Sequence, residues 1–106
     1  GTRTGEAKSF FAGDFQTLTE SGTAGGELAE HMPVAEDAEG KIVAVTAETA
    51  ANVVGITAAA AAADEPVVYY MTGEFFQEAL NLPDGVTVED IKGPLRKMSI
   101  FLRKLG

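Results

Sequence analysis

The residue types that most often do chemistry are sparse and scattered in this chain. His31 is the single histidine among 106 residues, and there is no cysteine. Without a second histidine or a thiolate, His31 lacks the partners of a tetrahedral zinc site, so we expect a surface or hydrogen-bonded side chain. The serines lack the G-x-S-x-G setting of a hydrolase nucleophile. They are Ser9, Ser21 and Ser99.

Two further segments share only their composition with ligand-binding loops. Glu36, Asp37 and Glu39 offer carboxylates that suit Ca²⁺, but their spacing is not that of an EF-hand loop, and a solvated turn is the better interpretation. The glycine-rich run at 22–27 has no Walker lysine. We therefore expect no metal, no cofactor and no catalytic residues. A small hydrolase or a metal-dependent lyase is the weakest functional alternative.

The charge of the chain is distributed unevenly. A net charge of −8 argues against direct binding of nucleic acid, because neutralising phosphates takes Lys and Arg. Residues 1–85 carry three basic and fourteen acidic side chains, and residues 86–106 carry five basic and two acidic ones. A basic end on an acidic body favours complementary contacts between subunits, with a solvated basic edge as the alternative.

A chain of this length predicts one domain, and no apolar run is long enough to span a membrane. The first residues also lack the apolar stretch of a signal peptide. The C-terminal segment 94–105 has a spaced apolar stripe beside basic residues, which is compatible with a membrane surface. A packed terminal element with a basic outer face is the preferred interpretation, so we expect no membrane partner.

Short β-rich segments bounded by turn signals predict the framework. Met32–Ala35 and Lys41–Thr46 flank a polar turn that ends in Gly40, a pattern typical of a hairpin. Val53–Thr57 predicts a further strand, in which Gly55 marks a bulge or a close backbone approach.

The segments that follow are a strong strand and two ambiguous stretches. Val67–Met71 is rich in β-branched and aromatic residues, which predicts a strand. The alanine run at 58–63 is too short for an isolated helix, so we interpret it as a strand continuing into a loop. Glu74–Leu80 fits either a strand or a helical turn.

The C-terminal part predicts a short helix and a last strand. Thr87 precedes two acidic residues and suits the N-cap of a helix, which Gly93-Pro94 should end or interrupt. A few helical residues up to Lys97 and a strand around Ser99–Leu102 are favoured, although the apolar spacing also fits a continuous helix. The fold class is mainly β: a small barrel-like or sandwich domain with one or two short helices.

Residues 1–27 predict a flexible N-terminal arm ahead of a single domain at 28–106. The arm is punctuated by glycines, yet it retains aromatic residues that disordered tails usually lack. Such residues either pack on a partner or cap the domain's own core. The candidate anchors for a partner are Phe10, Phe11, Phe15 and Leu18.

The order of these segments resembles the lambda-type bacteriophage head decoration proteins over roughly three quarters of the chain. The resemblance rests on four groups of residues. They are Gly25-Gly26 before a leucine, Met32-Pro33-Val34 with Lys41–Ala44, Val53–Ile56 before alanines, and Tyr69–Phe75 before Leu82-Pro83.

This resemblance implies a structural function. It implies a homotrimer that sits at local threefold positions on the outer surface of the virion capsid, having been made in the host cytoplasm. The trimer would bind the major capsid protein of the expanded head and stabilise the shell against DNA pressure. It also implies an arm that becomes ordered against the shell. The alternative is a phage tail or fibre-type adhesin that binds a receptor or a glycan.

Overall fold

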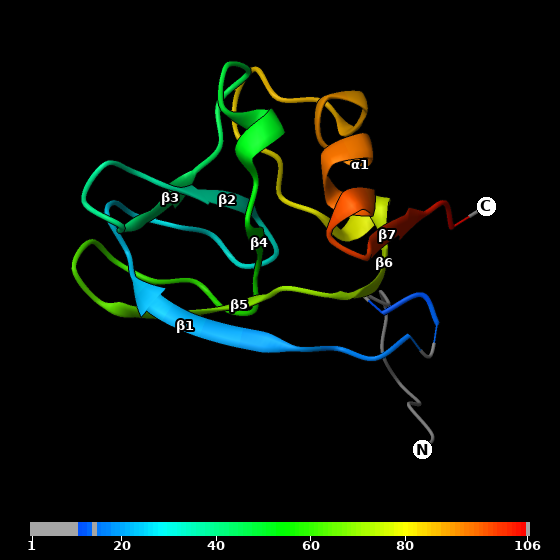
Figure 1. The fold of residues 1–106 in the computed structure, drawn as a ribbon, viewed down its shortest axis with the longest axis horizontal. Helices are drawn as coiled ribbons and strands as arrows, with labels where there is room; N and C mark the ends of the chain where they lie inside the picture. Colours follow the sequence, from blue (N-terminus) through cyan, green and yellow to red (C-terminus); the bar gives the residue numbers. More distant parts are fainter. Residues whose placement is uncertain (1–10, 14, 106) are drawn as a thin grey trace.

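Five antiparallel strands form the larger of two sheets, in the order β1-β5-β4-β2-β3 (Figure 1). The computed structural model describes residues 11–13 and 15–105. The strands are short and rich in β-branched residues, which suit a pleated, half-buried surface. Their bounds are β1 Thr19–Thr23, β2 Pro33–Glu36, β3 Ile42–Ala44, β4 Gly55–Thr57 and β5 Pro66–Tyr70.

The two edges of this sheet meet just after β1. Ala24 forms a parallel bridge with Ile42 of β3, and the backbone N–H of Gly25 donates to the carbonyl of Ile42 over 2.7 Å. The sheet therefore curls into a small barrel, and Ala24, fully buried, lies where the wall closes. Curling protects edges that would otherwise invite pairing with other chains.

A second layer covers one end of the barrel. Strands β6 (Gly73–Phe76) and β7 (Ile100–Arg103) pair in parallel, and the crossover between them contains helix α1 (Val88–Lys97). Short 3₁₀ turns, η1 (Ala50–Asn52) and η2 (Gln77–Ala79), complete the structure. Figure 1 shows α1 and β7 together at one end of the long axis, with the β2–β3 turn at the other.

The buried side chains form two groups. The barrel core lies inside the curled sheet and consists of Ala24, Leu28, Val34, Ile42, Ala61, Val67 and Tyr69. The helix-side core lies between the sheet, α1 and the β6–β7 pair, and its largest members are Ile56, Phe75, Ile91, Leu95 and Ile100. Burying both groups removes apolar surface from water, which stabilises the two layers.

The β-rich fold class is confirmed, and so are the hairpin and its glycine. Strands β2 and β3 pair antiparallel around a turn in which Gly40 has φ +82°. Gly55 also behaves as expected, because a Cβ there would collide with the carbonyl oxygen of Tyr70 on the neighbouring strand. The sequence of residues 74–80 fits either a strand or a helical turn, and the structure contains both: the strand β6 is followed by the helical turn η2.

Three local expectations are wrong. Residues 19–23 lie in the segment expected to be irregular, yet they form β1, because their backbone pairs with all five residues of β5. Gly93-Pro94 does not break α1, which runs on to Lys97. Burial of Ile91 and Leu95 on one helical face outweighs the hydrogen bond that proline cannot donate. The alanine run does not continue β4 as a strand, since β4 ends at Thr57, residues 58 and 59 form a bend, and Ala61 makes an isolated bridge with Leu28.

Helix α1 begins as its sequence predicts. The Thr87 hydroxyl accepts from the Asp90 backbone N–H, and the Asp90 carboxylate accepts from the Thr87 N–H, which is a capping box. Lys97 and Arg96 lie in its last turn, where positive charge complements the helix dipole. No helix within the described residues is long and apolar enough to cross a membrane.

Candidate binding surface

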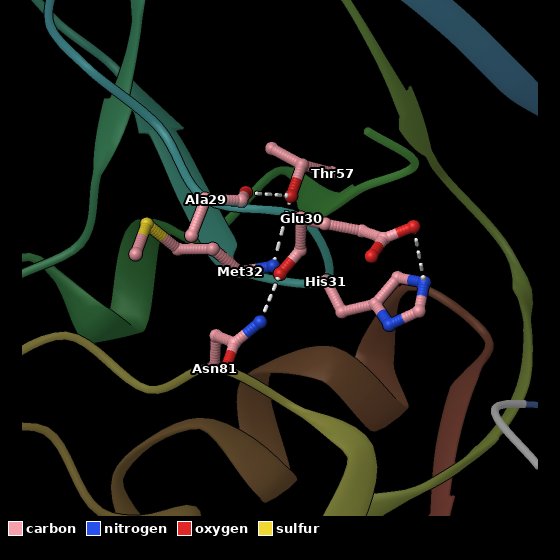
Figure 2. A network of polar contacts seen from close by, with 6 residues as sticks. All are labelled: Ala29, Glu30, His31, Met32, Thr57 and Asn81. Atoms are coloured by element: carbon pink, nitrogen blue, oxygen red, sulfur yellow. Dashed lines mark hydrogen bonds and ion pairs between the residues drawn. The ribbon is translucent and has the colours of Figure 1, made fainter. Parts of the chain in front are cut away.

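The polar network around His31 is structural. Figure 2 shows the Thr57 hydroxyl between the carbonyl of Ala29, to which it donates over 2.6 Å, and the N–H of Met32, from which it accepts over 2.8 Å. Thr57 is fully buried, so these bonds satisfy a group that would otherwise be costly to bury. They fasten the turn before β2 onto β4.

His31 itself lies at the bend of this turn. Its φ of +57° is in the left-handed region, and its Nε2 lies 3.6 Å from the Glu30 carboxylate (Figure 2). Asn81 holds the turn from the other side, since its backbone N–H donates to the His31 carbonyl over 2.9 Å. In the described part of the chain no group of three acidic or histidine side chains is placed to hold a metal ion.

The first aromatic residue of the arm packs into the domain. Phe11 forms an antiparallel bridge with Phe75, and the Ala12 N–H donates to the Glu74 carbonyl over 2.8 Å. The Phe11 ring meets Tyr70 edge-on with centroids 5.7 Å apart and lies 5.5 Å from the Phe75 ring. Phe11 thus lies against the helix-side core. This agrees with the alternative in which an aromatic residue of the arm caps the domain's own core. Phe10 lies outside the described residues.

Among the described residues of the arm, Phe15 and Leu18 are the large apolar side chains exposed to solvent. Phe15 is 42% exposed and touches Phe101 of β7 with one edge, at a centroid distance of 5.2 Å. Leu18 is 49% exposed. Large apolar side chains that a small domain leaves uncovered in this way are candidates for contact with another molecule.

The backbone beneath these two side chains is firmly held. Thr72 connects to it twice, because its hydroxyl donates to the Gln16 carbonyl over 2.8 Å and accepts from the Leu18 N–H over 3.0 Å. The Leu18 carbonyl in turn accepts from the Met71 N–H over 2.7 Å. A partner would therefore meet preorganised apolar groups, which lowers the entropic cost of binding.

Beside Phe101 lies a basic hollow. Lys92 and Arg96, one turn apart on α1, and Arg103 on β7 line it together with apolar atoms of Ile100, Phe101 and Leu102. Arg103 has a counterion, since its Nε lies 3.2 Å from a carboxylate oxygen of Glu74. The basic segment is evident in the sequence, whereas the meeting of these three cations at one hollow appears only in the structure. The i, i+4 spacing of Lys92 and Arg96 was the available signal.

The apolar stripe of the C-terminal segment is largely used inside the domain. Leu95 is fully buried and Leu102 is 6% exposed, and both belong to the helix-side core. Leu105 is the exception, at 53% exposed. The basic side chains are thus the outer face of a packed element, as the preferred interpretation of this segment describes.

The opposite end of the molecule is acidic. Asp37 organises the β2–β3 turn by accepting from the N–H groups of Glu39 and Lys41, each over 2.9 Å. Lys41 reaches across to Asp64, with Nζ 3.1 Å from the carboxylate oxygen. The hydrogen bond to Asp64 and the surrounding carboxylates raise the pKa of Lys41.

No protein-family model matches the chain, and no curated protein matches it at a significant level.

Proposed function

We propose that this protein is a capsid decoration protein that acts by binding. A homotrimer would sit at local threefold positions on the outside of an expanded phage head, contact the major capsid protein and hold the shell against DNA pressure. The observation that carries the proposal is the pair of exposed side chains, Phe15 and Leu18, on a backbone that the domain holds in place. The order of sequence segments from Gly25 to Leu102 supports the same family.

We assign two roles to the described part of the arm. Phe11 anchors the arm to its own domain through Tyr70 and Phe75, whereas Phe15 and Leu18 extend from it at the surface. Burying exposed apolar area of this kind contributes about 25 cal/mol per Å², so two side chains provide a modest single contact. Three such contacts on one trimer act at high effective concentration and give firm attachment.

The test uses point substitutions, because truncation through Phe11 would uncover the helix-side core. We expect the double variant Phe15→Ala/Leu18→Ala to remain folded and to bind expanded lambda-type heads stripped of decoration protein at least about tenfold more weakly. Val68→Ala is the matched control, since Val68 is 43% exposed but lies on β5, outside the arm. Head occupancy is measured by co-sedimentation, and shell stability by thermal disruption.

Two results would contradict the proposal. Wild-type occupancy by the double variant would show that these side chains do not contact the shell. Failure of the wild-type protein to bind heads, together with saturable binding to cells or glycans, would favour the adhesin alternative instead.

A further inference from the structure

The two ends of the molecule carry opposite charge in complementary shapes. At the α1–β7 end, three cations from two elements surround a hollow with an aromatic wall, namely Lys92, Arg96 and Arg103 beside Phe101. Arg103 is paired with Glu74, whereas Lys92 and Arg96 have no ion-pair partner among the described residues. This end is therefore concave and has unneutralised positive charge.

The other end protrudes and has unneutralised negative charge. The β2–β3 turn carries Asp37 and Glu39, and the neighbouring loop carries Asp64 and Glu65. Among the described residues, Lys41 is the one cation that pairs with this group, through Asp64. Ala38 is exposed between Asp37 and Glu39. We call residues 36–40 the acidic tip.

The fold holds the acidic tip and the basic hollow apart. The β2–β3 turn, which forms the tip, and α1 and β7 lie at opposite ends of the long axis, with the barrel between them (Figure 1). The residues that line the hollow belong to α1, to β7 and to no other element. The two surfaces of one chain therefore cannot neutralise each other, and a second copy is the partner that is always present at matching concentration. An acidic tip meeting a basic hollow also suppresses the reverse, like-charged orientation.

We propose that the basic hollow of one copy binds the acidic tip of a second copy. Glu39 of the tip pairs with Arg96, and Ala38 packs against Phe101 in the wall of the hollow. Because the two surfaces differ, the contact is head-to-tail, and repetition closes a ring or builds a chain. A ring of three would make this the subunit contact of the homotrimer, but the contact itself does not depend on capsid binding.

Nucleic acid is a poorer occupant of the hollow than a second copy. Residues 1–85 carry a formal charge of −11, so a phosphate backbone approaching the hollow would be repelled by most of the molecule. The acidic tip of a second copy meets less of this repulsion, because only its own few carboxylates enter the hollow. The charge of the chain therefore favours a small acidic protrusion over nucleic acid as the occupant of the hollow.

The test compares charge reversals by light scattering after size exclusion. The wild-type protein should associate in about 20 mM salt and dissociate at least about tenfold more readily in 500 mM salt, because screening shortens the Debye length. Arg96→Glu alone and Glu39→Lys alone should each give monomers. Both side chains are exposed, and neither forms an ion pair within the described structure, so both variants should fold.

The double variant Arg96→Glu/Glu39→Lys provides the decisive result. It restores opposite charges across the contact, so it should associate again in low salt. Glu48→Lys is the matched control, since it reverses an exposed acid in the loop before η1, away from the tip, and it should associate as the wild type does. Circular dichroism confirms the fold of each variant.

Three outcomes overturn the proposal. They are a wild-type monomer in low salt, association that is unchanged by both salt and Arg96→Glu, and failure of the double variant to associate again. These outcomes are separable from failure of the capsid proposal. That proposal is tested by Phe15 and Leu18 on phage heads, whereas this one is tested by the oligomeric state of the isolated protein.

Discussion

The barrel core and the helix-side core are built from different side chains and support different surfaces. The barrel core combines two alanines, two valines, Leu28 and Ile42 with the single ring of Tyr69, and outside it lies the acidic tip. The helix-side core gathers Phe75, Ile91, Leu95 and Ile100, all fully buried, and outside it lie the arm and the basic hollow. The larger core thus supports the arm and the basic hollow, and the smaller core supports the acidic tip.

Strand β5 joins the two regions. Its neighbours Tyr69 and Tyr70 point to opposite faces, as successive strand residues must, so Tyr69 enters the barrel core and Tyr70 packs against the helix-side core. A disturbance in either core therefore reaches the other through one short strand. This predicts that the two regions unfold together, and that their difference appears in the cost of matched substitutions.

The largest expected effect is the loss of stability when one buried leucine in each core is replaced by alanine. Leu95→Ala in the helix-side core and Leu28→Ala in the barrel core should each lower the free energy of unfolding by about 2–5 kcal/mol. Leu95 should cost more, because Leu28 lies beside Ala24 and Ala61, where fewer contacts are lost. Urea denaturation measures both. Two separate transitions in either variant would show that the regions are independent.

Two glycines should respond in opposite directions. Gly55→Ala should destabilise the barrel by about 3 kcal/mol, since the new Cβ collides with the Tyr70 carbonyl. Gly93→Ala in α1 should stabilise the protein by about 0.5–1 kcal/mol, because the space there is open and alanine favours a helix. Thermal unfolding gives the sign of each. A loss of stability in Gly93→Ala would mean that α1 is strained in a way its contacts do not show.

Each region also has a threonine hydroxyl that forms stabilising hydrogen bonds, and removing it should have a smaller effect on stability. Thr57→Val leaves the half-buried Ala29 carbonyl and Met32 N–H without their partner, and should lower the free energy of unfolding by about 2 kcal/mol. Thr87→Ala removes the exposed cap of α1 and should cost about 1 kcal/mol. Chemical denaturation ranks them. The reverse order would indicate that water replaces the Thr57 hydroxyl.

The smallest contrast concerns alkaline pH. Burial raises the pKa of both Tyr69 and Tyr70 above the ordinary value of 10.0. The folded state therefore favours the neutral phenols: this stability is fully present below pH 10 and is lost as pH rises through the folded-state pKa values. Tyr69→Phe and Tyr70→Phe should each flatten the decline, measured as unfolding free energy against pH. If the slope of unfolding free energy against pH is unchanged in both variants, other groups cause the decline.

Local sequence chemistry was sufficient where an element depends on its own residues. Gly40 in the hairpin turn and Thr87 at the helix start both behave as their residue types require, because turn and cap geometry involve only neighbours along the chain. The same reasoning failed for β1, whose residues Thr19–Thr23 have weak strand preference and gain their structure from pairing with β5. It failed at Pro94, where burial of the helical face dominates.

The candidate anchors illustrate the same division. The sequence indicated that Phe11 and Phe15 needed something to pack on, but both a partner and the domain's own core fitted that need. Only tertiary contacts separated them, by placing Phe11 on Phe75 and leaving Phe15 partly exposed above Phe101.

The sequence by itself determined the β-rich class through its short segments and turn signals, the sparse chemistry through its composition, and the opposite charges of the two chain segments through residue order. The tertiary structure decided where those charges lie, because the barrel separates the β2–β3 turn from α1 and β7 (Figure 1). It also brought Lys92, Arg96 and Arg103 into one hollow from positions up to eleven residues apart. Charge is a property of residues, whereas its arrangement in space depends on which distant segments pack together.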